Sequence, residues 1–465
     1  MQRADLGPRA PAALHAPGRY ADPAGPSSRG SPPRLLAADR GDADVTDLRE
    51  AAAHARRCAQ AWSARPVEER VYLLTGWAAT WINPLASSDR IDAVHEIAQG
   101  CGLSVPNVAW GITTTCDAAL SGLETLLTAS LGDLRRLGDY PTGAEGFPVR
   151  ALPIALCGHV WASTLPTSGW IPALASLALG SAVLIKAPRP ALAAAEHLAA
   201  SLAEFDPLLG QAVAVSSWTG GSATDAELVE LCDGIVVSGG RQAVDRYAAL
   251  SLARHRGAIP CVAFGPGESL AVAPVDAGEP DLDTLDALAL DVAAYDQLGC
   301  LSPTALWVEG AERVEPWAAG LASALDRVAL ELPRGEVPDD AAAAIMQRRG
   351  AAEFVGRVFE AADALVLLEP EPIGDTPRYR TVPVHTYDGG PTGLRDALMA
   401  RPRRPRLLSA AVAGGLDTRQ RYADALLPLG VHRICSPGIQ QSPPATWHHD
   451  GMNWLAQLVR FVDLG

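Results

Sequence analysis

Short apolar runs alternate with alanine- and leucine-rich segments between residues 151 and 267, and this alternation constrains the fold more than any other feature. The runs are PIALCGHV, SAVLIKAP, QAVAVSSW, DGIVVSGG and IPCVAFG, and the segments between them have helical spacing of apolar residues. Strands that alternate strictly with helices form a parallel sheet covered on both faces. We therefore expect an α/β protein that binds ligands at the carboxyl ends of these strands.

Other regions flank this alternation. Helical periodicity runs through residues 44–150, and a second set of strands and helices follows from residue 268. Residues 1–43 are rich in Pro, Gly, Ala and Arg and nearly lack large apolar side chains, which predicts a disordered tail or a misassigned start. A chain of 465 residues is too long for one ordinary core, so we expect two or three domains.

Composition argues against two classes of partner. The net charge of -15 and the pI of about 5.1 argue against nucleic acid, because phosphate binding needs clustered cations. The longest apolar run is interrupted by Pro172 and Gly180, so we expect no membrane span. The eight cysteines are scattered without metal-binding spacing and predict reduced thiols in a cytoplasmic protein.

Cys300 lies at a junction between two expected elements. An amphipathic helix ends at Gly299, and Ser302-Pro303 leads into a strand, so the thiol is held in the turn. A cysteine thiolate is a useful nucleophile because it can form and then release a thioester. The spacing of residues alone fits both alternatives, a catalytic nucleophile and a small cysteine that is merely buried.

Three separated blocks carry a resemblance to a known family. The passages YDQLGCLSP, CGHVWASTLPTSGW followed by SAVLIKAP, and PPATWHHDGMNWLAQLVRFVD together resemble the LuxC-type acyl-CoA reductases of the aldehyde dehydrogenase superfamily. The resemblance implies an aldehyde-dehydrogenase-like fold, with a Rossmann-type nucleotide domain and an α/β catalytic domain. The implied segments are a helical part of the cofactor domain (44–150), a dinucleotide-binding region (151–267), a catalytic domain (268–440) and a C-terminal segment that returns to the core (441–465).

The resemblance also implies a chemical role for Cys300. The thiol would attack an acyl thioester or acyl adenylate, and hydride from a nicotinamide would convert the acyl-cysteine to an aldehyde. We match His159 to the family's oxyanion-donating asparagine, with a hydrogen-bonded core histidine as the alternative. Ala263 takes the place of the glutamate that activates water in hydrolytic relatives, which favours net reduction, although a shift in register would place Glu268 there.

The expected cofactor site begins at Lys186, the only lysine in the chain. The resemblance implies that Lys186 reaches the adenosine ribose and that Arg189 replaces a glutamate common in NAD-preferring members. Because a guanidinium can pair with a 2′-phosphate, we expect NADPH rather than NADH, although Arg189 could also be an exposed residue that starts a helix. Gly220-Gly221 and Ser238-Gly239-Gly240 follow two strands, where they either approach the cofactor or form tight turns.

No metal is expected, because His448, His449 and Asp450 match no zinc spacing and the resemblance assigns WHHDG to a terminal structural signature. We expect NADPH-dependent reduction of an activated acyl group to an aldehyde in a homo-oligomer. The acyl group would arrive on CoA, on a carrier protein or as the adenylate made by an acid-activating partner. The alternatives are an aryl-acid reductase subunit, a CoA-acylating or oxidative aldehyde dehydrogenase, and a non-catalytic scaffold.

Overall fold

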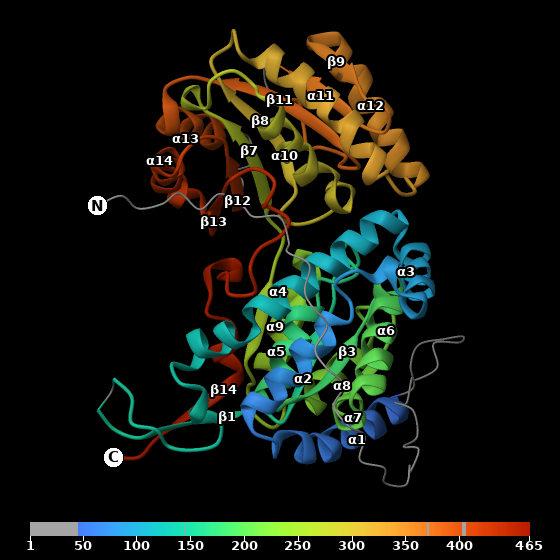
Figure 1. The fold of residues 1–465 in the computed structure, drawn as a ribbon, viewed down its shortest axis with the longest axis vertical. Coiled ribbons are helices and arrows are strands. Elements are labelled where there is room, and N and C mark those ends of the chain that lie inside the picture. The colour runs from blue at the N-terminus through green and yellow to red at the C-terminus, as the bar shows by residue number, and fades with distance from the viewer. Residues whose placement is uncertain (1–44, 145, 370–371, 402–405) are drawn as a thin grey trace. The chain divides into compact units, whose positions relative to one another are not determined.

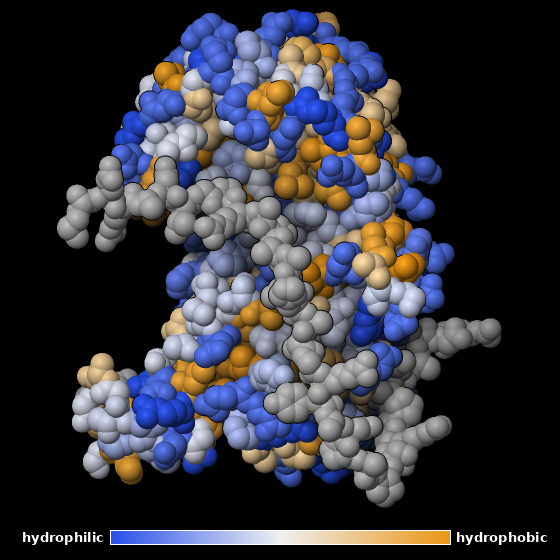
Figure 2. All heavy atoms as spheres, viewed as in Figure 1, coloured by the Kyte–Doolittle hydropathy of each residue, from blue (hydrophilic) through white to orange (hydrophobic). Residues whose placement is uncertain are grey.

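The computed structural model describes residues 45–144, 146–369, 372–401 and 406–465 (Figure 1). The tail predicted for residues 1–43 lies outside the described residues. In the described part of the chain, no helix is long and apolar enough to cross a membrane. Figure 2 shows hydrophilic residues spread over the visible face, with apolar residues interspersed among them.

A five-stranded parallel sheet is built from the runs that the sequence pattern marks as strands. Its order is β4(Val213–Ser216), β3(Ala182–Lys186), β2(Leu156–Val160), β5(Gly234–Ser238) and β6(Cys261–Phe264). The strand order reverses between β2 and β5, which is where open α/β sheets bind ligands. Every residue of β2 and β3 is buried, as expected of strands covered on both faces.

Helices cover this first sheet and precede it in the chain. The intervening helices are α5(Trp170–Leu179), α6(Arg189–Phe205), α7(Pro207–Gln211), α8(Ala223–Leu231) and α9(Arg241–Leu252). The preceding helices are α1(Val45–Ser63), α2(Val67–Ala79), α3(Ser88–Cys101) and α4(Val105–Leu131). The indole rings of Trp77, Trp81 and Trp170 lie 5.5 to 6.4 Å apart and join α2 to α5 in one core.

A second sheet of seven strands follows. Its order is β13(Arg433–Cys435), β12(Leu407–Val412), β7(Glu268–Ala273), β8(Pro303–Glu309), β11(Thr381–Tyr387), β10(Leu365–Leu368) and β9(Arg357–Glu360). All neighbours are parallel except β9 and β10. One face packs on α10(Leu282–Ala293) and α11(Val314–Glu331), beside α12(Asp339–Val355), and the other on α13(Gly390–Ala400) and α14(Leu416–Leu426) (Figure 1).

The C-terminal segment packs against the first core. Strand β14(Val459–Asp463) pairs antiparallel with β1(Val149–Pro153), the strand just before the five-stranded sheet. Trp454, Leu455 and Leu458 are buried in the same core as the first sheet. The remaining short helical turns are η1(Pro84–Ala86), η2(Leu134–Leu137), η3(Val275–Ala277), η4(Ala294–Gln297), η5(Leu427–Leu429), η6(His449–Gly451) and η7(Leu455–Leu458).

Candidate active site

Cys300 lies in the turn between η4 and β8, the junction predicted from the sequence. Its carbonyl oxygen accepts a hydrogen bond from the Ser269 hydroxyl of β7 at 2.8 Å, which ties the turn to the second sheet. The residue is half-buried and lines a cavity of about 150 Å³. This cavity, which we call the thiol cavity, is also lined by Phe264, Tyr295, Leu301, Trp447, His449 and Trp454.

The backbone leading to Cys300 adopts a conformation that is rare outside glycine. Tyr295, Asp296 and Gln297 have φ angles of 54°, 51° and 63°. Each such residue costs about 1 kcal/mol or more, so the run persists only where surrounding contacts enforce it. A second left-handed run, Arg378 to Arg380, has φ angles of 66°, 49° and 62°.

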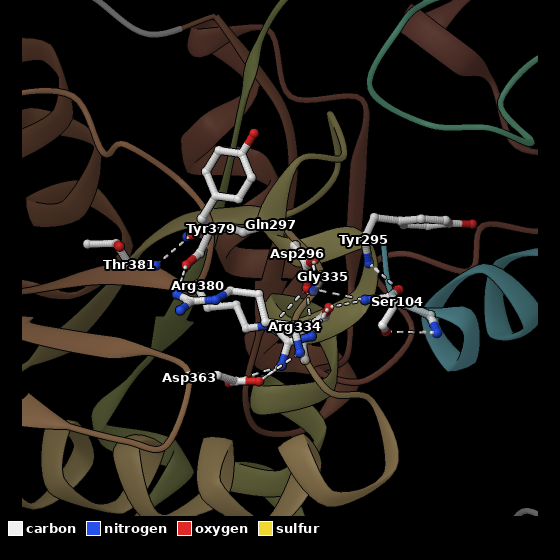
Figure 3. A network of polar contacts seen from close by, with 12 residues as sticks. Ser104, Tyr295, Asp296, Gln297, Arg334, Gly335, Asp363, Tyr379, Arg380 and Thr381 are labelled. Atoms are coloured by element: carbon white, nitrogen blue, oxygen red, sulfur yellow. Dashed lines mark hydrogen bonds and ion pairs between the residues drawn. The ribbon is translucent and has the colours of Figure 1, made fainter. Parts of the chain in front are cut away.

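A buried ion pair joins these two runs (Figure 3). The Arg380 guanidinium donates to Asp296 Oδ1 from Nη2 at 2.6 Å and from Nε at 2.9 Å, with both side chains almost fully buried. Asp296 Oδ2 accepts a further bond from the Gly335 N–H at 2.9 Å, and Arg380 also pairs with Asp363. Burial raises the pKa of the Asp296 carboxyl, and the charge of Arg380 opposes that shift.

The amide side chains of Asn107 and Gln297 also fix the turn that carries Cys300. Asn107 of α4 accepts a bond from the Tyr295 N–H at 2.7 Å and donates to the Ala293 carbonyl at 3.0 Å. Gln297 donates to the Pro303 carbonyl at 2.8 Å and accepts from the Thr381 N–H at 3.0 Å. The turn that carries Cys300 is therefore fixed to α4, β8 and β11 together.

Arg378 lies beside the thiol and was not identified from the sequence. Its guanidinium donates to the carbonyls of Gln297 at 3.0 Å and Gly299 at 3.1 Å. Enclosure of the sulfur raises the pKa of the Cys300 thiol to about 11, and Asp450 adds to the rise. The charge of Arg378 lowers this pKa, as do hydrogen bonds from the backbone at Cys300 and Leu301.

A second cavity, of about 370 Å³, is lined in part by Arg378. Besides Arg378 it is lined by Arg241, Arg401, Arg406 and Glu268, and we call it the arginine cavity. Glu268 is paired with Arg401 at 2.8 Å and does not line the thiol cavity. Among the residues that the structure describes, no carboxylate lines the thiol cavity.

The WHHDG passage contributes to the thiol cavity rather than to a metal site. His449 stacks between Phe264, with ring centroids 3.9 Å apart, and Trp447, at 4.5 Å. Burial lowers the pKa of His449 to about 4, so its ring is neutral at pH 7. Within the described ranges, no group of three potential ligand side chains could hold a metal ion.

His159 lies on β2 and contacts α5. Its side chain is 1% exposed, and its Nε2 lies 3.1 Å from the Ser176 hydroxyl. Burial lowers the pKa of His159 to about 3, and the residue does not line the thiol cavity. These contacts fit the alternative of a hydrogen-bonded core histidine, and the role of oxyanion donor stays a prediction. The groups that do reach the cavity are Thr115, Thr167 and Tyr295, whose hydroxyls are hydrogen-bonded to one another.

Lys186 ends β3 at the carboxyl edge of the five-stranded sheet. Its Nζ lies 6.0 Å from the Trp218 ring centroid and forms no hydrogen bond within the described part of the chain. Burial lowers the pKa of the Lys186 ammonium, and the charge of Asp225 opposes the shift. Ser216, its register neighbour on β4, has a buried hydroxyl without a partner among the described residues. These two polar groups fit a ligand at this edge.

The other predicted cofactor residues lie at the same edge. Arg189 begins α6, is exposed and forms no ion pair in the ranges that the structure covers. Ser238 ends β5, the Gly239 N–H is bonded to the Phe264 carbonyl, and Gly240 caps α9 without a side chain. A Cβ added at Gly220, Gly221 or Gly240 would meet no atom within 4 Å. This open space fits a nucleotide, although the Gly221 N–H already donates to Asp225 at 2.7 Å.

Comparison with known sequences places these features in context. A family model described as acyl-CoA reductase (LuxC) matches residues 63–461. A long-chain acyl-protein thioester reductase of Vibrio harveyi is 26% identical over 352 residues, which cover 74% of this chain and 70% of the relative. The corresponding reductase of Aliivibrio fischeri is 24% identical over 351 residues, covering 74% and 70%.

Similar solved structures are aldehyde dehydrogenases. Gamma-glutamyl-gamma-aminobutyraldehyde dehydrogenase from Burkholderia cenocepacia has a TM-score of 0.70 at 17% identity and covers 93% of this chain and 92% of its own. Indole-3-acetaldehyde dehydrogenase AldA from P. syringae, in complex with NAD+ and IAA, has a TM-score of 0.69 at 13% identity, covering 91% and 89%. The predicted aldehyde-dehydrogenase-like α/β fold with parallel sheets is confirmed.

Removing the cation of the buried ion pair should destabilise the protein strongly. Arg380→Met leaves the Asp296 charge buried without its partner, and we expect a loss of about 3–5 kcal/mol in unfolding free energy. Arg349→Met, which breaks the partly exposed pairs with Glu353 and Glu360, should cost less, about 1 kcal/mol in total. Urea unfolding followed by circular dichroism measures both, and equal losses would contradict the assigned role.

The charge of Arg378 should control the reactivity of Cys300. Arg378→Gln raises the thiol pKa further, so iodoacetamide should alkylate Cys300 about three- to tenfold more slowly at pH 8. In the unaltered protein the rate should rise with pH towards pH 11, because a raised pKa delays formation of the thiolate. Mass spectrometry of the Cys300 peptide gives the rate, with Cys58 of α1 as the internal control. Arg378→Lys should retain most of the rate, and an unchanged rate in Arg378→Gln would disprove the effect.

Proposed function

Since this chain belongs to the LuxC acyl-CoA reductase family, we propose that it reduces an activated acyl group to an aldehyde with NADPH, through an acyl thioester on Cys300. One observation carries the proposal. The Cys300 thiol lines a largely apolar cavity without a carboxylate in the described residues, and Arg378 lies beside it. This arrangement suits a thiol that is acylated and whose acyl thioester is then reduced rather than hydrolysed.

The Cys300 thiol gives its proton to solvent, and the thiolate attacks the acyl carbon. As the new C–S bond forms, the bond to the donor breaks and the donor leaves as a CoA or carrier thiolate or as AMP. Arg378 and the backbone N–H groups of Cys300 and Leu301 favour the thiolate, which offsets part of the effect of enclosure. The negative charge that develops on the acyl oxygen needs donors fixed in advance. We assign that role to the Cys300 N–H and to the hydroxyls of Thr167 and Tyr295 in the same cavity.

The acyl-cysteine is protected from rapid hydrolysis because no carboxylate of the described residues lines the cavity, and the low pKa of His449 makes its ring a weak base. Ala263 occupies β6 one residue before Phe264, and an alanine cannot activate water. The Glu268 carboxylate is paired with Arg401 and faces the arginine cavity instead. The thioester therefore persists until it is reduced. A reduced nicotinamide, when bound, would supply a hydride to the acyl carbon, and collapse of the resulting thiohemiacetal oxyanion would break the C–S bond, release the aldehyde and return Cys300 as a thiolate.

The cofactor residues at the sheet edge favour a phosphorylated nucleotide. The Lys186 ammonium would donate to the adenosine ribose, and the exposed Arg189 guanidinium would pair with a 2′-phosphate. Ser238, Gly239, Gly240 and the Gly220-Gly221 turn leave room for the rest of the nucleotide. Similar structures include an E. coli enzyme described as NADP dependent and one bound to NAD+, so the fold itself permits either.

The acyl donor is proposed from the relatives. Their names describe an acyl group carried on a protein as a thioester. We propose that Cys300 receives its acyl group from CoA, from a carrier protein or from the adenylate made by an acid-activating partner. The chain then acts as the reductive half of a two-step conversion of an acid to an aldehyde.

Loss of the thiol should abolish reduction. We expect Cys300→Ala to lower the rate of NADPH oxidation with acyl-CoA substrates by about 10⁴-fold or more, because nucleophilic catalysis is lost. Cys58→Ala, on α1 and away from the cavity, should leave the rate unchanged. Absorbance at the reduced-nicotinamide band follows the reaction, and turnover that survives in Cys300→Ala would refute the acyl-cysteine pathway.

Arg189 should set the choice of nucleotide. Arg189→Glu removes the partner of the 2′-phosphate and adds repulsion, so we expect the ratio of kcat/KM for NADPH over NADH to fall about 10- to 100-fold. Arg256→Glu makes the same charge change at an exposed position after α9 and should leave the ratio unaltered. A ratio that does not move in Arg189→Glu would remove the argument for NADPH.

A further inference from the structure

The thiol cavity is small compared with the acyl groups named for the relatives. Those proteins are called long-chain acyl-protein thioester reductases, whereas the cavity here measures about 150 Å³. A volume of about 150 Å³ is of the size that accommodates one benzene molecule, and the thiol cavity also opens to solvent. A long alkyl chain is much larger than one ring and would have to leave the cavity after a few carbons.

The walls that limit this volume are held rigidly. The Tyr295 ring lies directly over Gly111 of α4, where an added Cβ would come within 2.6 Å of it, and Trp110 packs edge-on against the same ring at 5.5 Å. Because Tyr295 belongs to the left-handed run, the backbone that positions its ring is also fixed. On the opposite side Ala445 packs against Gly122 of α4, at 3.0 Å from an added Cβ. The cavity therefore cannot widen at α4 without repacking.

The shape and chemistry of the walls suit a planar group. His449, Phe264 and Trp447 form one continuous stack, and Trp454 meets the Phe264 ring edge-on at 6.1 Å. Aromatic rings add favourable offset or edge contacts with another ring beyond simple burial. Polar side chains also reach the cavity, namely Thr114, Thr115, Thr167, Ser168 and Gln441. Covering such groups with an alkyl chain costs free energy, whereas a substituted ring can bond to them.

We propose that the acyl group accepted by Cys300 is a compact, ring-bearing one, such as a benzoyl or substituted benzoyl group, and not a long alkyl chain. The inference rests on the proposed function for the chemical step, but the selectivity of the cavity is a separate property. Ala118 of α4 lines the cavity without filling it and offers a site where the volume can be reduced. Trp447 offers a site where the volume can be increased.

Kinetics test the proposal directly. With NADPH, kcat/KM for benzoyl-CoA should exceed that for tetradecanoyl-CoA at least tenfold. Ala118→Leu should lower the benzoyl-CoA value tenfold or more, whereas Ala129→Leu, at an exposed position of the same helix, should not. Trp447→Ala should raise the tetradecanoyl-CoA value relative to benzoyl-CoA. A tetradecanoyl-CoA value equal to or above that of benzoyl-CoA in the unaltered protein would overturn the proposal.

Binding to Cys300→Ala separates this inference from the proposed function. Calorimetric titration with benzaldehyde and with decanal involves no covalent step in that variant. We expect tighter binding of benzaldehyde, weakened at least tenfold when Ala118→Leu is added. If benzaldehyde binds more tightly than decanal but the unaltered protein reduces no acyl thioester, the proposed function fails and the preference of the cavity for ring-bearing groups stands. Tighter binding of decanal, no binding of benzaldehyde, or insensitivity to Ala118→Leu would each overturn the inference.

Discussion

The buried ion pair between Asp296 and Arg380 is the interaction on which the site depends. It joins two backbone runs that are both left-handed and both free of glycine, so neither run would persist as an isolated peptide. A buried pair of charges is stabilising only when its remaining hydrogen bonds are satisfied. Here Gly335, Asp363 and Asn107 supply those bonds. The result is a turn whose conformation is set by tertiary contacts and which carries the nucleophile at its end.

The thiol cavity is assembled from parts that are distant along the chain. One wall comes from α4, another from the turn that precedes β8, and a third from the C-terminal segment with Trp447 and His449. Arg378, from the second left-handed run, lines the arginine cavity and donates to the Gly299 carbonyl just before the thiol. The same ion pair thus fixes both the thiol and the cation beside it, because Asp296 and Arg380 each lie within four residues of one of them.

The sequence was sufficient for the strands and for the position of Cys300, because alternation and element junctions are local patterns. It also located Lys186 and the glycine pairs correctly at strand ends, since those positions follow from the strands themselves. It left two alternatives open for His159, because the contact of that β2 side chain with Ser176 of α5 is one that residue spacing does not encode. The structure alone reveals Arg378 and the place of His449 in the thiol cavity, because both depend on contacts across long stretches of chain.

Propensity does not predict the left-handed conformation of Tyr295, Asp296 and Gln297, since only Asp296 is of a type that visits it often and then as a single residue rather than in a run of three. That conformation results from partners such as Arg380, which lies 84 residues further along the chain. The resemblance assigned the WHHDG passage to a structural signature. It did not predict that Trp447 and His449 line the thiol cavity. Local sequence therefore identifies the nucleophile, whereas its environment is a property of the whole fold.

The pairing of β14 with β1 has a consequence for biosynthesis. Residues 459–463 pair with residues 149–153, and the intervening C-terminal segment contributes the last wall of the thiol cavity. During translation, α4 and the five-stranded sheet are synthesised before Cys300, whereas Trp447 and Trp454, which form the remaining wall, are synthesised after it. The thiol cavity is therefore completed only after β14 has been added and has paired with β1, and the sulfur of Cys300 is more open to solvent until that pairing.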